Sequence, residues 1–331
     1  MRRGGLAGAF GQSGYRAMIT DSLPPPSSIR IVVVGAGAMG GYFASRIAES
    51  GPSVLLIDVD ENRVSAVARL GLRIEDDTGD RWVAVGAALA AQVSEKFDLI
   101  IVFTKGMHTN SAIESVRHLV GERTWFLTLQ NGLGNPEAIQ AAYPRNRVAM
   151  GVTDVPADLI DHTHIRSHGK GSVRLWALDG ESAPAIEQIS ALLERAGVPC
   201  VADPEIGAAV WEKATFNAAL NAVAALTRKP VDGLDNSEGR ALIGAIVAEA
   251  AATAAATGLA VDPARILAKI DFALAHHRGH EPSMLQDIMA GRRTEIETIN
   301  GAIVAAAAAR GVATPVNWTV AHLIRIAQRQ S

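Results

Sequence analysis

The sequence holds a single cysteine, Cys200, among 331 residues. One thiol excludes an intrachain disulfide and is too few for a cysteine–histidine zinc cluster. This scarcity agrees with a reducing compartment, and we expect the protein in the cytoplasm. No apolar run approaches the length needed to cross a bilayer, so we expect no membrane-spanning segment.

A large excess of charge of either sign is also lacking. The 31 basic and 34 acidic side chains give a formal net charge of -3 with histidine neutral. This balance gives no reason to expect nucleic acid or an anionic membrane as a partner. The composition, 48% hydrophobic and 20% charged, is that of an ordinary globular protein, and the length allows two domains.

Residues 1–28 lack a periodic apolar pattern and are rich in Gly, Ser and Pro. Their basic start is followed by small residues, but the continuous apolar segment of a targeting signal is missing. We therefore expect a flexible N-terminal tail, or an upstream start with Met18 as the true initiator.

A glycine-rich turn follows the first strong strand pattern. The β-branched run 29–34 predicts a buried strand, and a helical pattern follows from residue 41. Between them the GxGxxG motif predicts a dinucleotide site, with phosphates at the helix N-terminus. The glycines allow a tight turn, close approach of the pyrophosphate and close packing of helix on strand. The predicted cofactor-binding turn consists of Gly35, Ala36, Gly37, Ala38, Met39 and Gly40.

A second strand pattern, 54–57, ends at Asp58. An acidic residue at this distance accepts hydrogen bonds from the adenosine ribose and repels a 2′-phosphate, so Asp58 favours NAD(H). The alternative is a cap for the next helix, a role that Asp60 could fill instead. Arg63 lies one turn further on and could still meet a phosphate.

Two later strand patterns, 98–103 and 124–129, are followed by Lys105 and Asn131. Ligands of open α/β sheets lie beyond the carboxyl ends of the strands, so these side chains are candidate cofactor contacts. Their alternative is turn chemistry, since Asn-Gly is a common turn pair. Further strand patterns at 73–85, 148–153, 173–177 and 200–201, and a helix at 183–196, complete a predicted Rossmann domain over residues 29–202.

From residue 203 onward helical patterns replace strand patterns, so residues 203–331 are predicted to form a helical domain that carries substrate and catalysis. The fold class is α/β, an N-terminal Rossmann domain followed by an all-α C-terminal domain. Two capping-box patterns, S-M-L-Q from Ser283 and T-E-I-E from Thr294, place Ser283 and Glu295 at helix starts. Helix starts can face a bound anion, although both residues could also serve as caps only.

The helix predicted over 211–226 is apolar on almost every side. Lys213, Asn217 and Asn221 recur at i, i+4 and i+8 and form one polar stripe. A buried ammonium and two buried carboxamides are costly without partners, so the stripe is predicted to line a polar cleft. The alternative is an amphipathic helix with a solvated stripe.

The run 276–280, His-His-Arg-Gly-His, has a metal-like composition. It lacks the i, i+4 spacing of helical metal ligands, so we expect a solvated helix end and no metal site.

Together these motifs resemble the ketopantoate reductase (2-dehydropantoate 2-reductase) family over about residues 29–310. The combination is far more specific than any member of it. The motifs, in order, are GAGAMG, Thr-Lys105, Gln-Asn131-Gly, Trp-Glu-Lys213-x-x-x-Asn217-x-x-x-Asn221, Ser283-Met-Leu-Gln-Asp and Thr-Glu295-Ile-x-x-Ile-Asn-Gly301.

The resemblance implies reduction of a small 2-oxo acid, ketopantoate to pantoate in pantothenate biosynthesis, with NADP(H) as cofactor and substrate between the domains. It implies that Lys213 is the general acid for the C2 oxygen and Glu295 its orienting partner. The other implied contacts are Asn217, Asn221 and Ser283 to substrate, and Lys105 and Asn131 to cofactor. A homodimer is compatible with the sequence, which does not itself show the oligomeric state.

Two positions depart from the family pattern. Val231 stands where an asparagine often helps to hold substrate, and Asp58 stands near a basic residue of NADPH-preferring members. Two other functions stay open. A β-hydroxyacid dehydrogenase also pairs a Rossmann domain with a Lys-x-x-x-Asn helix, although Asn221 and the SMLQD and TEI segments weigh against it. A non-catalytic dinucleotide-binding regulator would keep the glycines without needing the lysine.

Overall fold

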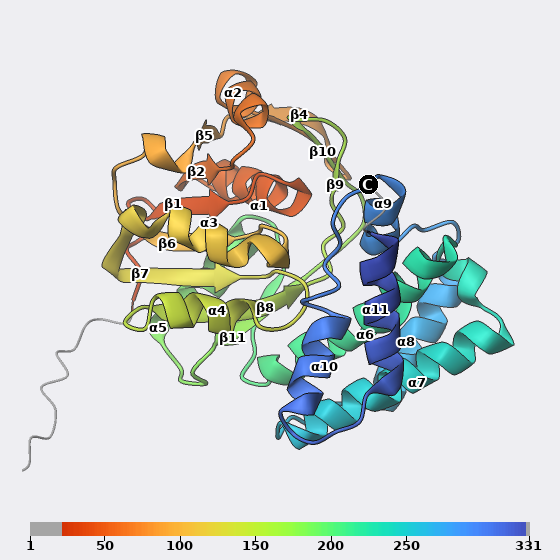
Figure 1. The fold of residues 1–331 in the computed structure, drawn as a ribbon. Coiled ribbons are helices and arrows are strands. Elements are labelled where there is room, and N and C mark those ends of the chain that lie inside the picture. Colours follow the sequence, from red (N-terminus) through yellow and green to blue (C-terminus); the bar gives the residue numbers. More distant parts are fainter. Residues whose placement is uncertain (1–21, 329–331) are drawn as a thin grey trace, which may run out of the picture.

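The computed structural model describes residues 22–328. An α/β domain lies beside a helical one, and the predicted fold class is confirmed (Figure 1). The strand β12 (Cys200–Ala202) is the last strand of the described chain, and α6 (Ile206–Thr227) leads into the helical domain.

The main sheet has the strand order β12-β11-β8-β7-β6-β1-β2-β5. All neighbours are parallel except β8 and β11. The carboxyl ends of β1, β6, β7 and β8 therefore share one edge, which places the loops after these strands together. The bounds are β1 (Arg30–Val34), β2 (Ser53–Ile57), β5 (Gly86–Ala88), β6 (Phe97–Val102), β7 (Val120–Thr128), β8 (Arg147–Thr153) and β11 (Val173–Ala177).

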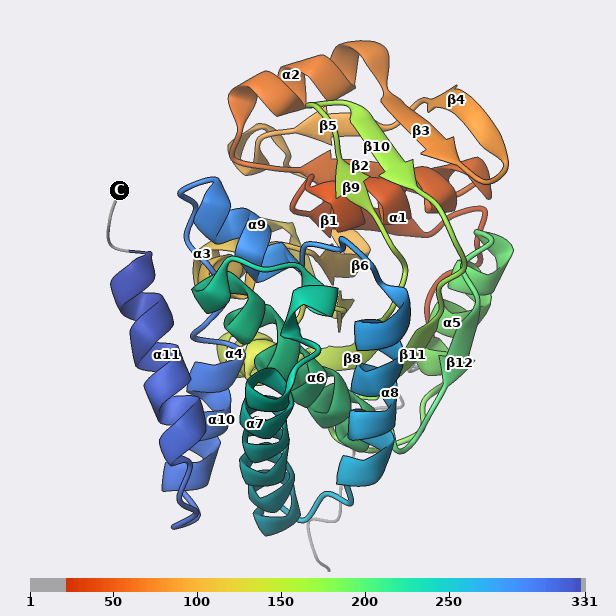
Figure 2. The ribbon, with the colours of Figure 1, turned by 90° about the vertical axis from the view of Figure 1, so that its right-hand side faces the viewer.

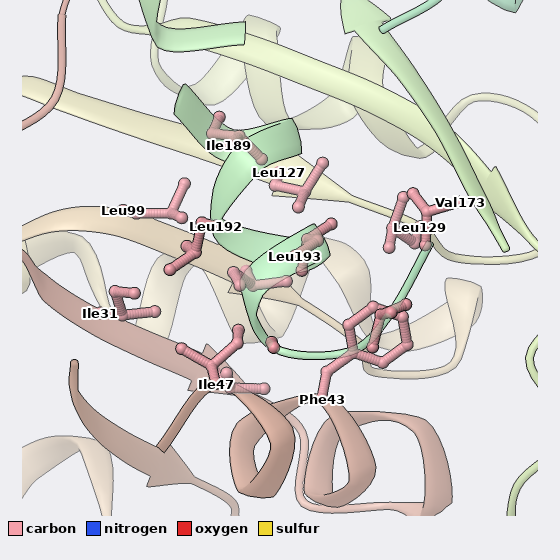
Figure 3. Packing of buried hydrophobic residues seen from close by; sticks show 14 of the residues in the cluster. Ile31, Phe43, Ile47, Leu99, Leu127, Leu129, Val173, Ile189, Leu192 and Leu193 are labelled. Atoms are coloured by element: carbon pink, nitrogen blue, oxygen red, sulfur yellow. The ribbon is translucent and has the colours of Figure 1, made fainter. Parts of the chain in front are cut away.

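Helices cover both faces of this sheet because its strands are apolar on both sides. On one face α1 (Ala38–Glu49) and α5 (Pro184–Arg195) pack over the strands, with Ile47 of α1 and Leu192 of α5 near Ile31 of β1 (Figure 3). The other face carries α3 (Thr109–Ser115) and α4 (Asn135–Ala142). The helix α2 (Glu61–Leu70) packs against β5 at the edge.

The strand pattern at 73–85 forms the hairpin of β3 (Leu72–Asp76) and β4 (Gly79–Val83). The hairpin belongs to a separate four-stranded sheet, completed by β10 (His164–Ser167) and β9 (Asp158–Leu159). This second sheet was not predicted from the sequence. Its central pairing joins β3 to β10, and a pairing between segments so far apart leaves no local pattern.

The helical domain is built around α6, which contacts each of the other five helices (Figure 2). The apolar sides of α6 form the centre of its core. The surrounding helices are α7 (Ser237–Ala256), α8 (Pro263–His276), α9 (Ser283–Met289), α10 (Asn300–Ala308) and α11 (Pro315–Ala327).

Two expectations about the chain ends and apolar segments need correction. Leu23 lies within the expected tail, yet it is buried in the sheet–helix core and exchanges backbone hydrogen bonds with the side chain of Gln188, so residues 22–28 differ from the expectation. Among the described residues, α7 is long and apolar enough to cross a membrane by length and composition. It packs against α6, α8, α10 and α11 of the helical domain.

Candidate active site

The glycine turn after β1 leaves room for a ligand only at its centre. A Cβ on Gly40 would lie 1.8 Å from the carbonyl oxygen of Gly35, and one on Gly35, where φ is +104°, would lie 2.8 Å from the Thr104 nitrogen. A Cβ on Gly37 would meet no protein atom within 4 Å. Gly37 is the N-cap of α1 and makes no side-chain cap, so the first amides of α1 face this open space. The turn therefore fits the pyrophosphate of a dinucleotide.

Asp58 holds the glycine turn from the end of β2. Its carboxylate accepts hydrogen bonds from the backbone nitrogens of Ala36 at 2.6 Å, Val59 at 2.8 Å and Asp60 at 3.0 Å. The helix-cap role belongs to Asp60, whose side chain accepts from the nitrogens of residues 62 and 63. A guanidinium nitrogen of Arg63 lies 3.8 Å from Asp58, so both a carboxylate and a cation stand at this corner of the turn.

Lys105 and Asn131 lie in the loops after β6 and β7, at the same sheet edge as the glycine turn. The Lys105 ammonium contacts both carboxylate oxygens of Asp287 at 2.5 Å, which ties the α/β domain to α9. Asn131 also serves the turn, because its carbonyl accepts from the side chain of Asn135 and Gly132 follows at φ +86°. Turn chemistry and position at the sheet edge thus occur together.

The polar stripe of α6 is largely shielded from solvent, with Asn217 and Asn221 buried and Lys213 half-buried, which excludes the solvated alternative. The Lys213 ammonium donates to the carbonyl oxygen of Thr153, at the end of β8, at 2.5 Å. Asn217 and Asn221 are each 8% exposed, and between residues 22 and 328 neither carboxamide has a hydrogen-bond partner. Two unpaired, buried amides beside a half-buried ammonium are what a site for a polar ligand requires.

Glu295 lies near the stripe from the other side. One carboxylate oxygen accepts a hydrogen bond from the backbone nitrogen of Gly106 at 3.0 Å. Burial raises the pKa of Glu295, and the positive charges of Lys105 and Lys213 oppose that rise. The desolvation of Lys213 lowers its pKa to about 8, and the charges of Asp154 and Glu295 oppose that fall. Lys213 and Glu295 therefore lie close enough to influence each other's protonation.

Neither capping box forms as predicted. Pro282 is the N-cap of α9, so Ser283 is the first helical residue, and the Gln286 side chain donates to the carbonyl of Glu281. The proline has no N–H that a reciprocal bond from Gln286 could reach. Ser283 is exposed.

Glu295 lies in a turn, and α10 begins five residues later at Asn300. The predicted helix start at 294 is therefore wrong. The reason is that Glu297, the residue expected to complete the box, pairs with Arg325 of α11 instead.

The histidine run at 276–280 ends α8, where the His276 ring stacks on Phe272. Within the described part of the chain, no group of three or more His, Cys, Asp or Glu side chains is arranged to hold a metal ion.

Sequence reasoning missed two acidic residues that contribute to the site's charge. Asp287 is 3% exposed and also pairs with Arg292 at 3.0 Å. It stands in the SMLQD motif, where a lone acid within an apolar helix turn was a usable signal. Asp154 follows the carbonyl that holds Lys213, and no local pattern indicated it.

Comparison with known proteins agrees with this geometry. The family model "Ketopantoate reductase PanE/ApbA" matches residues 31–180, and the model "Ketopantoate reductase PanE/ApbA C terminal" matches residues 205–328. A 2-dehydropantoate 2-reductase of Archaeoglobus fulgidus is 31% identical, over 89% of this chain and 97% of the relative.

Two solved structures share the whole fold. A 2-dehydropantoate 2-reductase from Geobacter metallireducens is 31% identical with a TM-score of 0.84, over 90% of this chain and 100% of that one. A D-mandelate dehydrogenase in complex with NADH and anilino(oxo)acetate is 28% identical with a TM-score of 0.86, over 91% of this chain and 99% of that one. The chain is therefore a member of the ketopantoate reductase family and a dinucleotide-dependent oxidoreductase.

Proposed function

We propose that the protein reduces a 2-oxo acid with NAD(P)H, and that this acid is ketopantoate, which becomes pantoate in pantothenate biosynthesis. One observation carries the proposal. Lys213 contacts the end of β8, on the sheet edge that also holds the glycine turn, and Asn217 and Asn221 continue its stripe along α6, with the charge of Glu295 nearby. We assign residues 29–202 to dinucleotide binding and residues 203–331 to substrate binding and catalysis.

The residues of the site suit the two halves of such a reduction. The bound dinucleotide supplies the hydride. Gly37 and the first amides of α1 hold its pyrophosphate, and Lys105 and Asn131 contact it from the neighbouring loops. Lys213 donates a proton to the C2 oxygen and its ammonium stabilises the negative charge that develops there.

The remaining side chains orient the substrate. Asn217 and Asn221 have free donors and acceptors on the same helix face as Lys213, so they can bind the oxo and hydroxyl groups. We assign the contact with the substrate carboxylate to Ser283, which is exposed at the first turn of α9. Glu295 orients Lys213 and the substrate hydroxyl.

Initial rates of NADH and NADPH oxidation with ketopantoate and a panel of other 2-oxo acids test this function. Efficient turnover of ketopantoate alone would support it. Tight dinucleotide binding without turnover of any acid would contradict it and favour a regulator that binds dinucleotide.

A second candidate is the reduction of a 2-oxo acid with an apolar or aromatic side chain. Val231 replaces an asparagine that holds substrate in the family, and it is 2% exposed within the apolar core of the helical domain. The D-mandelate dehydrogenase structure with this fold contains anilino(oxo)acetate, an oxoacetate that carries a phenyl ring through nitrogen. Phenylglyoxylate and 2-oxoisovalerate therefore belong in the panel, and turnover of either one without ketopantoate would favour this candidate.

We expect NADH to be preferred over NADPH. Asp58 and Asp60 both stand at the adenosine end of the turn, and a 2′-phosphate there would face two carboxylates and one guanidinium, that of Arg63. Asp58→Asn should reduce the preference for NADH over NADPH about tenfold or more, since one charge contact is worth about 1.4 kcal/mol or more in a desolvated site. The ratio of kcat/KM for the two cofactors measures it, and a wild-type preference for NADPH would contradict the expectation.

We expect kcat/KM for 2-oxo acid reduction to fall as the pH rises through about 8. The pKa of Lys213 is lowered to about 8, so above that pH the ammonium loses the proton that it must donate. A pH profile of initial rates between pH 6 and 10 measures this alkaline limb, the fall of kcat/KM above about pH 8. In Lys213→Arg any residual activity should lack this limb, because a guanidinium stays protonated throughout the range.

A further inference from the structure

Residues 295–300, which we call the connector, touch both domains at the site. The Gly106 nitrogen donates to Glu295 at 3.0 Å, and the Leu133 nitrogen donates to the carbonyl oxygen of Thr298 at 2.7 Å. At the other end the Asn300 side chain donates to the carbonyl of Ala218, next to Asn217 on α6, at 3.2 Å. The connector thus joins the loops after β6 and β7 to the helix that carries Lys213.

The contact of Thr298 with these loops depends on two glycines. A Cβ on Gly106 would lie 2.6 Å from Cγ2 and 2.8 Å from Oγ1 of Thr298, and a Cβ on Gly132 would lie 2.2 Å from the Thr298 carbonyl oxygen. These approaches are too close for any side chain. Gly106 does not have a positive φ, so a side chain is excluded there by Thr298 and not by the backbone conformation.

Thr298 also shapes the turn that presents Glu295. Its hydroxyl donates to the Glu295 carbonyl at 3.2 Å, and its nitrogen donates to the same oxygen at 3.1 Å. The Glu295 carboxylate is fixed at the same time by Gly106, the glycine against which Thr298 packs. A displacement of Thr298 from Gly106 would therefore move the carboxylate as well.

We propose that Thr298 is a positioning residue for the reaction. By docking on the backbones of Gly106 and Gly132, it holds the Glu295 carboxylate near Lys213. The inference rests on the proposed function, because it assigns a purpose to the Lys213–Glu295 pair. It adds that the same contact sets the distance between the loops after β6 and β7 and the Lys213 ammonium. The positions of the hydride donor and the proton donor then depend on the same contact.

Gly106→Ala tests the proposal sterically, because the new methyl group would collide with Thr298. We expect kcat to fall roughly 10- to 100-fold, the size of effect that follows a displacement of about 1 Å in an active site. The second variant is Gly106→Ala with Thr298→Ala, in which the colliding Cγ2 and Oγ1 are removed and the nearest remaining atom, Cβ, lies 3.1 Å from the new methyl. This double variant should recover most of the lost kcat. Gly121→Ala is the matched control, since its Cβ would make ordinary contacts, with Thr124 Oγ1 at 3.5 Å and Lys96 Cβ at 3.9 Å.

The pH profile separates positioning from simple loss of stability. We assign a fall of kcat/KM at low pH to protonation of Glu295, whose carboxylate orients Lys213. The Gly106 hydrogen bond lowers the pKa of Glu295, so its loss in Gly106→Ala should move this fall to higher pH. The pH profile of kcat/KM in Gly121→Ala should match that of the wild type. Thr298→Ala alone provides the same readout if Gly106→Ala does not fold, with a smaller loss of kcat and a shift in the same direction.

Wild-type kcat in folded Gly106→Ala, or a double variant as slow as the single one, would overturn the role of Thr298. So would a Thr298→Ala enzyme with an unchanged kcat and pH profile. None of these results would touch the proposed function, which is tested separately by the panel of 2-oxo acids and by substitution of Lys213.

Discussion

Lys213→Met should lower kcat by about 10²–10⁴-fold, the usual worth of a positioned general acid. Methionine keeps an unbranched side chain at this position of α6 but cannot donate a proton or stabilise the developing oxyanion. Removal of a desolvated ammonium should not lower the melting temperature, because the lowered pKa shows that burial already disfavours that charge. Steady-state kinetics with the preferred oxo acid, beside thermal unfolding, measure both effects.

Lys229→Met is the matched control for this prediction. Lys229 lies just beyond the end of α6, is exposed, and is outside the site. The Lys229→Met variant should keep the wild-type kcat. Turnover of Lys213→Met within a fewfold of the wild-type value would show that another group donates the proton.

Gly40→Ala and Gly37→Ala should separate folding from cofactor binding. The Cβ on residue 40 would lie 1.8 Å from the Gly35 carbonyl, so α1 must shift, and overpacking of this kind costs about 1–3 kcal/mol of stability. At residue 37 the new methyl meets no protein atom, but it occupies the space left for the pyrophosphate. We expect the first variant to unfold at lower temperature and the second to keep its stability while NADH binding weakens about 100-fold or more, as loss of close backbone contacts to phosphate implies.

Thermal unfolding and a fluorescence titration with NADH measure these two quantities. A Gly37→Ala protein that binds NADH as tightly as wild type would show that the pyrophosphate does not lie against residue 37. Weakened binding with an unchanged melting temperature in Gly40→Ala would contradict the packing role of Gly40.

Much of this architecture could be predicted from local sequence. The strand–turn–helix around the glycines, the strands after which Lys105 and Asn131 stand, and the polar stripe on α6 are each set by residues close together in the chain. The stripe needed one further step, the cost of burying an ammonium and two amides.

The features that escaped prediction depend on partners distant in sequence. The second sheet needs β10 to reach β3, and Asp287 gains its place in the site from Lys105. The capping pattern at 294 is a sound local signal, but Glu297 pairs with Arg325, which a local pattern cannot contain. Tertiary contacts of this kind override local preference wherever a segment docks on another domain.

The hydrogen bond between Lys213 and the Thr153 carbonyl has a consequence for the entropy of catalysis. A free lysine side chain carries about 2 kcal/mol of rotamer entropy. Here a backbone oxygen at the end of a sheet strand restrains the Lys213 side chain, so part of that entropy is lost when the protein folds and not when substrate binds. An ammonium has three protons, and two remain for other acceptors while one stays on Thr153. The main chain of one domain thus orders the proposed proton donor of the other before any substrate arrives.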